Sequence, residues 1–180
     1  MKKRAGFTII ELMVTLVVAA IGLTIAIPGF AHFLRSQRAT ASANEFLVAL
    51  TYARSEALKR DAPVAVCASS NAQTATPACS GKNNWTKGWI TFVDDDTSGT
   101  DGSYDSASET LLRVHPVSGE VTITADGSPG ADYVRFVGDG TAENANADFK
   151  VKPTGCTDTQ QRHVNMSPTG RADVVSENCS

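Results

Sequence analysis

The first eleven residues carry the clearest chemical pattern in the chain. A basic leader ends at Gly6, Phe7 follows, and Glu11 is the one ionisable group in the apolar stretch that comes next; the leader's cations are Lys2, Lys3 and Arg4. An ordinary secretory signal is cut after its apolar core, which the mature protein then lacks. Here the convincing cleavage point, between Gly6 and Phe7, precedes the core. Cleavage there would remove the three cations, free the amine of Phe7 and keep the hydrophobic helix.

The carboxylate of Glu11 predicts an ion pair with that amine. An uncompensated acid deep in a bilayer costs on the order of 3 kcal/mol on insertion scales. Along a helix Glu11 lies about 6 Å from Phe7, so it can reach the interface while the chain is in a membrane. In a water-poor bundle of packed helices it would need a cation, and we predict the Phe7 amine of a neighbouring subunit. The alternative is a membrane anchor with an incidental interfacial acid.

The apolar stretch over residues 7 to 27 predicts a helix long enough to cross a membrane. Its 21 residues would rise roughly 30 Å, which matches the thickness of a hydrocarbon core. The cations that precede it favour a cytoplasmic N-terminus. We therefore expect a single pass, with the rest of the chain outside the cytoplasm.

Periodicity predicts the elements that follow. Apolar residues at three- and four-residue spacings predict an amphipathic helix over 31 to 59, and Pro28 should kink the helix before it. Eight later segments alternate with a period of two between Gly, Asp, Asn, Ser and Pro clusters. They are residues 63–68, 89–93, 111–115, 120–124, 133–137, 149–151, 163–167 and 172–175. An antiparallel sheet with a helix over its apolar face is an α+β fold.

The chain divides into a leader (1–6), a transmembrane and assembly helix (7–30) and a globular head (31–180) that includes the amphipathic helix. The head's 150 residues suffice for one hydrophobic core. Without the leader, 13 basic and 19 acidic residues leave a net charge of minus 6. This balance does not indicate a nucleic-acid partner.

Four cysteines lie outside the anchor, where an oxidising compartment favours disulfides: Cys67, Cys79, Cys156 and Cys179. Three pairings are open to four cysteines. We expect Cys67 with Cys79 and Cys156 with Cys179, because each pair closes a local loop and could contribute around 3 kcal/mol. A zinc site is the competing interpretation, but the C-x₂-C spacings of such sites are missing.

A calcium-loop register begins at Asp94. Positions one, three, five, six and twelve of the register are taken by Asp94, Asp96, Ser98, Gly99 and Asp105. The flanks are predicted strands, Asp at the last position reaches less far than the usual Glu, and Asp and Gly also favour hairpin turns. We therefore predict no resident metal or cofactor, with calcium as the alternative.

No catalytic motif is recognisable in the sequence. His32, His115 and His163 stand outside any known nucleophile or metal motif. Gly81 and Lys82 lack the earlier glycine of a phosphate-binding loop. We therefore expect that the protein is not an enzyme.

The C-terminal region is the least acidic part of the chain. Residues 31 to 149 carry a net charge of minus 6, whereas residues 150 to 180 carry plus 1. The cations are Lys150, Lys152, Arg162 and Arg171. Without aromatic partners for base stacking, they could support only weak, salt-sensitive and sequence-blind DNA binding. The alternative is that they are solvated loop charges.

The leader resembles the class III leader of type IV pilins and pseudopilins. That pattern is a short basic leader, then Gly, Phe and Thr, with Glu fifth in the mature chain, and its residues here are Gly6, Phe7, Thr8 and Glu11. The resemblance implies a type IV pilin fold, cleavage by a prepilin peptidase and methylation of the Phe7 amine. It also implies assembly with other pilins into a helical filament.

Three internal motifs resemble the GspH/FimT type of minor pilin, which includes FimT- and FimU-like subunits. They are residues 53–60 before a strand that ends at Cys67, residues 88–94 and residues 167–171. Pro28 is typical of pilus subunits and often missing from their secretion-system counterparts. The resemblance implies a type IV minor pilin at the inner membrane and then at the pilus tip, serving pilus assembly, motility and adhesion. Its implied partners are major and minor pilins, the prepilin peptidase and the pilus assembly platform.

Three alternatives stay open: a type II secretion pseudopilin of the GspH type, a DNA receptor of a competence pilus, and a tethered domain that does not polymerise. DNA-binding FimT-like minor pilins carry a C-terminal Gly-Arg-x-Arg element, which here reads Gly170, Arg171, Ala172 and Asp173. The first arginine matches. The acid in place of the second removes a phosphate contact and adds repulsion.

Overall fold

The computed structural model describes residues 8–81, 85–95, 100–117, 120–126, 132–143 and 148–180, without the side chains of Ile25 and Pro28. The chain falls into two units, residues 1–34 and 35–180. One helix, α1 (Ile9–Arg60), contributes to both. α1 ends at Arg60, one residue after the end predicted from the sequence, residue 59.

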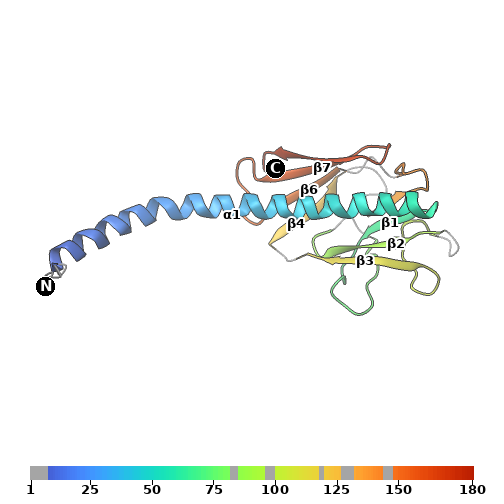
Figure 1. The fold of residues 1–180 in the computed structure, drawn as a ribbon, viewed down its shortest axis with the longest axis horizontal. Helices are drawn as coiled ribbons and strands as arrows, with labels where there is room; N and C mark the ends of the chain where they lie inside the picture. The colour runs from blue at the N-terminus through green and yellow to red at the C-terminus, as the bar shows by residue number, and fades with distance from the viewer. Residues whose placement is uncertain (1–7, 82–84, 96–99, 118–119, 127–131, 144–147) are drawn as a thin grey trace, which may run out of the picture. The chain divides into compact units, whose positions relative to one another are not determined.

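Eight strands follow α1 and form two antiparallel four-stranded sheets (Figure 1). The first sheet has the order β3-β2-β1-β5 and the second has the order β4-β6-β7-β8. The strands are β1 (Val64–Ala68), β2 (Gly88–Val93), β3 (Thr110–Pro116), β4 (Val121–Asp126), β5 (Tyr133–Phe136), β6 (Asp148–Pro153), β7 (Gln161–Met166) and β8 (Ala172–Glu177). All eight predicted strands and the α+β class are confirmed. The sequence did not predict that the strands divide into two sheets.

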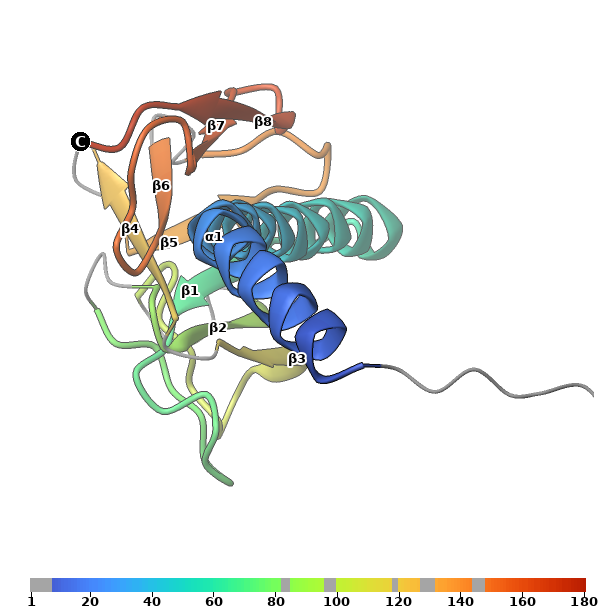
Figure 2. The same cartoon turned by 90° about the vertical axis from the view of Figure 1, so that its left-hand side faces the viewer.

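The second half of α1 lies along both sheets, as Figures 1 and 2 show. Its buried apolar residues follow one another at alternating spacings of four and three, which places them on one face of the helix. They are Ala39, Ala43, Phe46, Leu50, Ala53 and Ala57. Four of the six are alanine, so the helix backbone can approach the strands closely. One hydrophobic core therefore joins α1 to the inner faces of both sheets.

Phe46 lies at the centre of this core. Its ring makes edge-to-face contacts with Trp85, Trp89 of the first sheet and Phe149 of the second, at centroid distances of 5.2, 5.0 and 4.7 Å. Such aromatic pairs contribute about 0.5–1.5 kcal/mol each beyond the area that they bury. The four rings are fully buried. The helix and the two sheets thus meet at a single side chain.

The helix ends where its sequence stops supporting helical geometry. Asp61 adopts a left-handed conformation with φ of 50°, which Asp tolerates better than most residues. The N–H of Ala62 then donates to the carbonyl oxygen of Ala57 at 3.3 Å, in the manner of a helix C-terminal cap. Pro63 follows and cannot continue the helix. The chain therefore turns directly into β1.

The face of the first sheet turned away from α1 carries a smaller core. Ala65, Cys67, Ile90 and Phe92 are buried there, and Tyr104 and Tyr133 pack against them. Gly102 fits against the Tyr133 ring with φ of +72°, and a Cβ there would lie 2.1 Å from the ring. The loop between β2 and β3 can therefore cover this face only with glycine at that position.

A buried ion pair fixes the same loop to β5. The Nε of Arg135 donates to Oδ2 of Asp94 at 2.9 Å, with side chains only 6% and 1% exposed. The same carboxylate oxygen accepts the N–H of Gly102 at 2.9 Å. Arg135 also pairs with Glu143. A buried charge without a partner is strongly destabilising, so Asp94 and Arg135 hold each other in place.

Glu109 lies close to this ion pair, just before β3. Its residue is 8% exposed, and Oε2 accepts the N–H of Asp105 at 2.6 Å. Burial raises the pKa of the Glu109 carboxyl, the Asp105 N–H opposes the shift, and the negative charge of Asp94 adds to it. The charged form of Glu109 is therefore disfavoured in the folded protein.

Replacing Phe46 with Ala should lower the free energy of unfolding by about 3–5 kcal/mol, because the cavity removes contacts with both sheets. Denaturant unfolding of the full chain in detergent micelles, followed by tryptophan fluorescence, measures the change. Val48→Ala is the matched control, since Val48 lies two residues on and is 60% exposed; it should change the free energy by less than about 0.5 kcal/mol. Equal losses in the two variants would contradict a central role for the aromatic cluster.

Replacing Glu109 with Gln should stabilise the protein at about pH 7 and leave its stability unchanged at about pH 3. The pKa of the Glu109 carboxyl is higher in the folded state than in the unfolded state. Ionisation of this carboxyl therefore destabilises the folded state as the pH rises through the two pKa values, and this penalty is absent below both of them. Gln keeps the acceptor for the Asp105 N–H and can donate to Asp94. Melting temperatures of both proteins across this pH range measure the effect; a variant less stable than the native protein at neutral pH would refute it.

Candidate functional site

The start of α1 holds Glu11 in a capping arrangement. The N–H and Oγ1 of Thr8 both lie 3.2 Å from Oε2 of Glu11, and the N–H of Glu11 lies 3.3 Å from Oγ1 of Thr8. This is the reciprocal capping box of a Thr-x-x-Glu sequence, which satisfies free N–H groups at a helix start. The sequence analysis assigned Glu11 to assembly alone and did not predict the capping role of Thr8, although the three-residue spacing carried the signal. Gly6 and Phe7 lie outside the described residues.

The first unit exposes an almost wholly apolar helix surface. Large hydrophobic side chains from Ile9 (76% exposed) to Phe33 (54% exposed) lie on every side of it. They are Ile9, Ile10, Leu12, Met13, Val14, Leu16, Val17, Val18, Ile21, Leu23, Ile27, Phe30 and Phe33. Continuous apolar surface of this extent marks contact with lipid or with other proteins. Glu11 is the only acid within it.

Taken alone, no helix in the described part of the chain combines the length and the hydropathy of a membrane span. Two stretches, Ile9–Thr24 and Gly29–Arg60, meet both requirements together, across a bend of 41°. The predicted kink at Pro28 stays a prediction, because that side chain is not among those described.

The four C-terminal cations do not form one cluster. In the second sheet, Lys150 pairs with His163 and Val151 pairs with Arg162. Because side chains alternate along a strand, Lys150 and Lys152 lie on the outer face, while Arg162 lies on the inner face with the buried Val151. Arg171 lies in the turn that follows β7, at the end of the sheet opposite to Lys152. Measured along β7, the positions of Lys152 and Arg171 are roughly 20 Å apart.

Arg162 is bound to α1 rather than presented to a partner. Its Nη2 donates to Oγ of Ser36 at 2.9 Å and its Nε donates to Oγ1 of Thr40 at 3.1 Å. Its Nη1 donates to the carbonyl oxygens of Thr159 and Gln161 at 2.9 and 3.0 Å. All three guanidinium nitrogens are thus used within the head. The sequence could not predict this, since Ser36 and Thr40 are more than 120 residues away.

Gly170 and Arg171 form part of a structural turn. Gly170 has φ of +75°, and a Cβ there would lie 2.1 Å from the carbonyl oxygen of Gly140. The same oxygen accepts the Nε of Arg54 on α1 at 2.9 Å. Glycine is therefore required here for close packing, while Arg171 is exposed.

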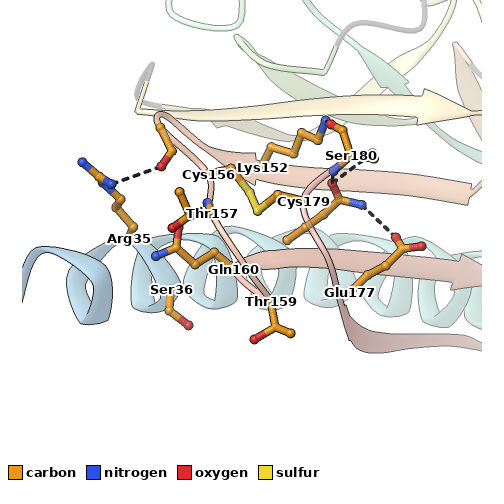
Figure 3. The surroundings of a disulfide bond; sticks show 12 residues. Arg35, Ser36, Lys152, Cys156, Thr157, Thr159, Gln160, Glu177, Cys179 and Ser180 are labelled. Atoms are coloured by element: carbon orange, nitrogen blue, oxygen red, sulfur yellow. Dashed lines mark hydrogen bonds between the residues drawn. A yellow bond between two sulfur atoms is a disulfide. The ribbon is translucent and has the colours of Figure 1, made fainter. Parts of the chain in front are cut away.

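The C-terminal tail is held at the opposite end of the second sheet (Figure 3). Cys156 is joined to Cys179, and Cys67 is joined to Cys79 in the first sheet. Lys152 donates to the carbonyl oxygen of Ser180, and Gln161 donates to Glu177 at 2.7 Å. Arg35 of α1 donates to the carbonyl oxygen of Gly155, in the loop between β6 and β7, at 3.1 Å. Lys152 therefore has a partner within the head.

The calcium register can be followed only in part, because Asp96, Ser98 and Gly99 lie outside the described residues. Asp94 is engaged with Arg135, as described above. The carboxylate of Asp105 accepts the N–H of Ala107 at 2.9 Å and the hydroxyl of Ser108 at 3.1 Å. Across the ranges that the structure describes, no three His, Cys, Asp or Glu side chains gather as a metal site would require.

Two known patterns match the sequence. Residues 42–170 match the family described as type II transport protein GspH, and residues 1–27 match the prokaryotic N-terminal methylation motif. The first match covers well over half of the chain. No curated protein matches the sequence.

Two crystal structures of the type IV minor pilin FimU from Pseudomonas aeruginosa share the fold. One is 23% identical, with a TM-score of 0.54 over 76% of this chain and 91% of that one. The other is 22% identical, with a TM-score of 0.56 over 79% and 92% of the two chains. The fold of this chain is thus that of type IV pilins. Together with the two sequence matches, it shows that the chain belongs to the GspH family and is a type IV minor pilin or pseudopilin.

Proposed function

We propose that this protein is a minor pilin of a type IV pilus that enters the filament through its N-terminal helix. The observation that carries the proposal is the exposed apolar surface of the first unit, with Glu11 as its only acid, directly after an N-terminal methylation motif. Before assembly, residues 7–30 cross the inner membrane once and residues 31–180 form a periplasmic head. Residues 1–6 are the leader that the prepilin peptidase removes.

Assembly exchanges lipid for neighbouring helices around this apolar surface. Both surroundings are apolar, so the transfer itself changes the hydrophobic energy little. The carboxylate of Glu11 and the methylated amine of Phe7 on a neighbouring subunit form the polar contact that selects the assembled state. Burial of either charge without the other would be strongly destabilising.

We further propose a place in the complex at the pilus tip that initiates assembly. Similarity to the minor pilin FimU and the presence of Pro28 favour a type IV pilus. The family description as a type II transport protein favours the second candidate, a pseudopilin of a type II secretion system. Genes for pilus retraction beside this gene would support the first machine, and genes for an outer-membrane secretin of a secretion system would support the second.

DNA uptake does not form part of the proposed function. Of the four cations predicted to contact DNA, Arg162 is bound to α1, Lys152 is bound to the tail, and Arg171 lies at the other end of the sheet. A groove that tracks a nucleic-acid backbone needs adjacent cations. The DNA-binding role of Lys150, Lys152, Arg162 and Arg171 stays a prediction of the sequence.

Replacing Glu11 with Ala or with Gln should leave leader cleavage intact and abolish entry into the filament. Removing one member of a buried ion pair costs about 3–5 kcal/mol, so incorporation should fall by more than about 100-fold. Quantitative mass spectrometry of sheared pili against the membrane fraction measures incorporation.

Two variants separate the charge of Glu11 from its capping role. Gln can complete a capping box but carries no charge, whereas Thr8→Ala breaks the capping box and keeps the charge. The proposal requires Glu11→Gln to fail like Glu11→Ala and Thr8→Ala to assemble. If Glu11→Gln enters filaments normally, the carboxylate charge is not what drives assembly.

A further inference from the structure

An open groove of about 270 Å³ lies between α1 and β3. Glu45 and Val48 of α1 form one wall, Trp89 of β2 forms part of the floor, and the residues of β3 form the other wall; these are Arg113, Val114 and His115. Aromatic and aliphatic side chains that dominate binding energies at interfaces commonly fill pockets of this kind.

Two contacts between α1 and β3 bound the groove. His115 stacks on Trp89 at a centroid distance of 4.4 Å, and its Nε2 lies 3.3 Å from Oε2 of Glu45. The guanidinium of Arg113 lies 3.7 Å from the centre of the Tyr52 ring. Stacking on a ring leaves the in-plane N–H donors of an arginine free. The groove is thus apolar between two polar ends.

The groove offers an unused apolar contact. Val48 is 60% exposed. An occupant with an apolar side chain would therefore suit it.

The position of β3 indicates that the occupant is an extended chain. β3 ends its sheet, so one side of its backbone is open to an added strand. Arg113 and His115 pair with Thr91 and Trp89, so alternate residues of β3 point toward α1. A strand added beside β3 would direct every second side chain to the same face, beside Val48. A helix or a small molecule would leave the strand edge unpaired.

Charge identifies the chemistry of this segment. No carboxylate among the described residues lies within 4.0 Å of the Arg113 guanidinium, which is exposed. Arginine binds carboxylates with paired N–H donors, so an acidic residue beside the apolar one would complete the site.

We propose that the groove between α1 and β3 binds an extended segment of a neighbouring pilin head, which adds to the edge of β3. The segment places an apolar side chain beside Val48 and a carboxylate on Arg113. This inference rests on the proposed function, since it requires neighbouring subunits. The pairing is short, because the register of β3 shifts opposite Thr91 and Phe92 and Pro116 ends the strand.

Photo-cross-linking in piliated cells tests the docking site with the full chain. A benzophenone amino acid at Val48 should capture another pilin through a head peptide that carries Asp or Glu within about two residues of the linked one. Arg113→Gln should lower the yield about threefold or more, and Arg113→Lys should retain most of it. Near-ultraviolet circular dichroism confirms that both variants are folded.

Two further positions distinguish the possible failures. Leu58 lies on α1 outside the groove and is 51% exposed, so the probe there should not capture the same peptide. The probe at Phe30, 63% exposed, reports helix packing in the filament. Capture at Phe30 but not at Val48 would overturn the docking site alone, and no capture at either would overturn the proposed function with it. The site would also be overturned if the probe at Val48 captured a second copy of this chain, a helical segment or a protein that is not a pilin. An unchanged cross-linking yield with Arg113→Gln would overturn it as well.

Discussion

Both sheets of the head depend on one buried face of α1. Phe46 contacts Trp89 of the first sheet and Phe149 of the second, so neither sheet can shift along the helix without breaking an aromatic contact. Edge-to-face packing also requires particular ring angles, which fixes the rotation of α1 about its axis. Rotation would expose Phe46 and bury Glu45. The side chains on the other faces of the helix are therefore oriented from inside the core.

Secondary structure was predictable because its signals are local. Segments of period two between clusters of turn residues located all eight strands, and the spacing of apolar residues located the end of α1. The division into two sheets was not predictable, since alternation shows which face of a strand is buried but not which strand lies beside it. The pairing of β1 with β5 joins residues about 70 positions apart. The buried pair of Asp94 and Arg135 spans 41 positions, and for the same reason no pattern near Asp94 indicated it.

The candidate sites show the same limit. Glu11 was recognisable because its neighbours along the chain define its role, and the capping partner Thr8 lies three residues away. The C-terminal cations were grouped by closeness in sequence, yet strand alternation places Lys152 and Arg162 on opposite faces of one sheet. A count of charges cannot detect this separation. Closeness in sequence predicts a shared site on a helix or in a loop, but on strands it must be combined with the side-chain period.

In the proposed function, the N-terminal helix and the head supply different parts of subunit recognition. Apolar packing around residues 9–34 is non-directional, and a carboxylate paired with an N-terminal amine is available to every chain that carries the same leader. These contacts can hold a subunit in a filament but cannot distinguish one minor pilin from another. Specificity requires features that differ between heads and that penalise wrong partners. In the docking proposed above, the strand edge of β3, with an arginine at one end of an apolar groove, would have this character because it would reject segments that lack an acid or a properly placed apolar residue. A subunit that occupies one defined place among several minor pilins therefore needs such a surface in addition to its helix.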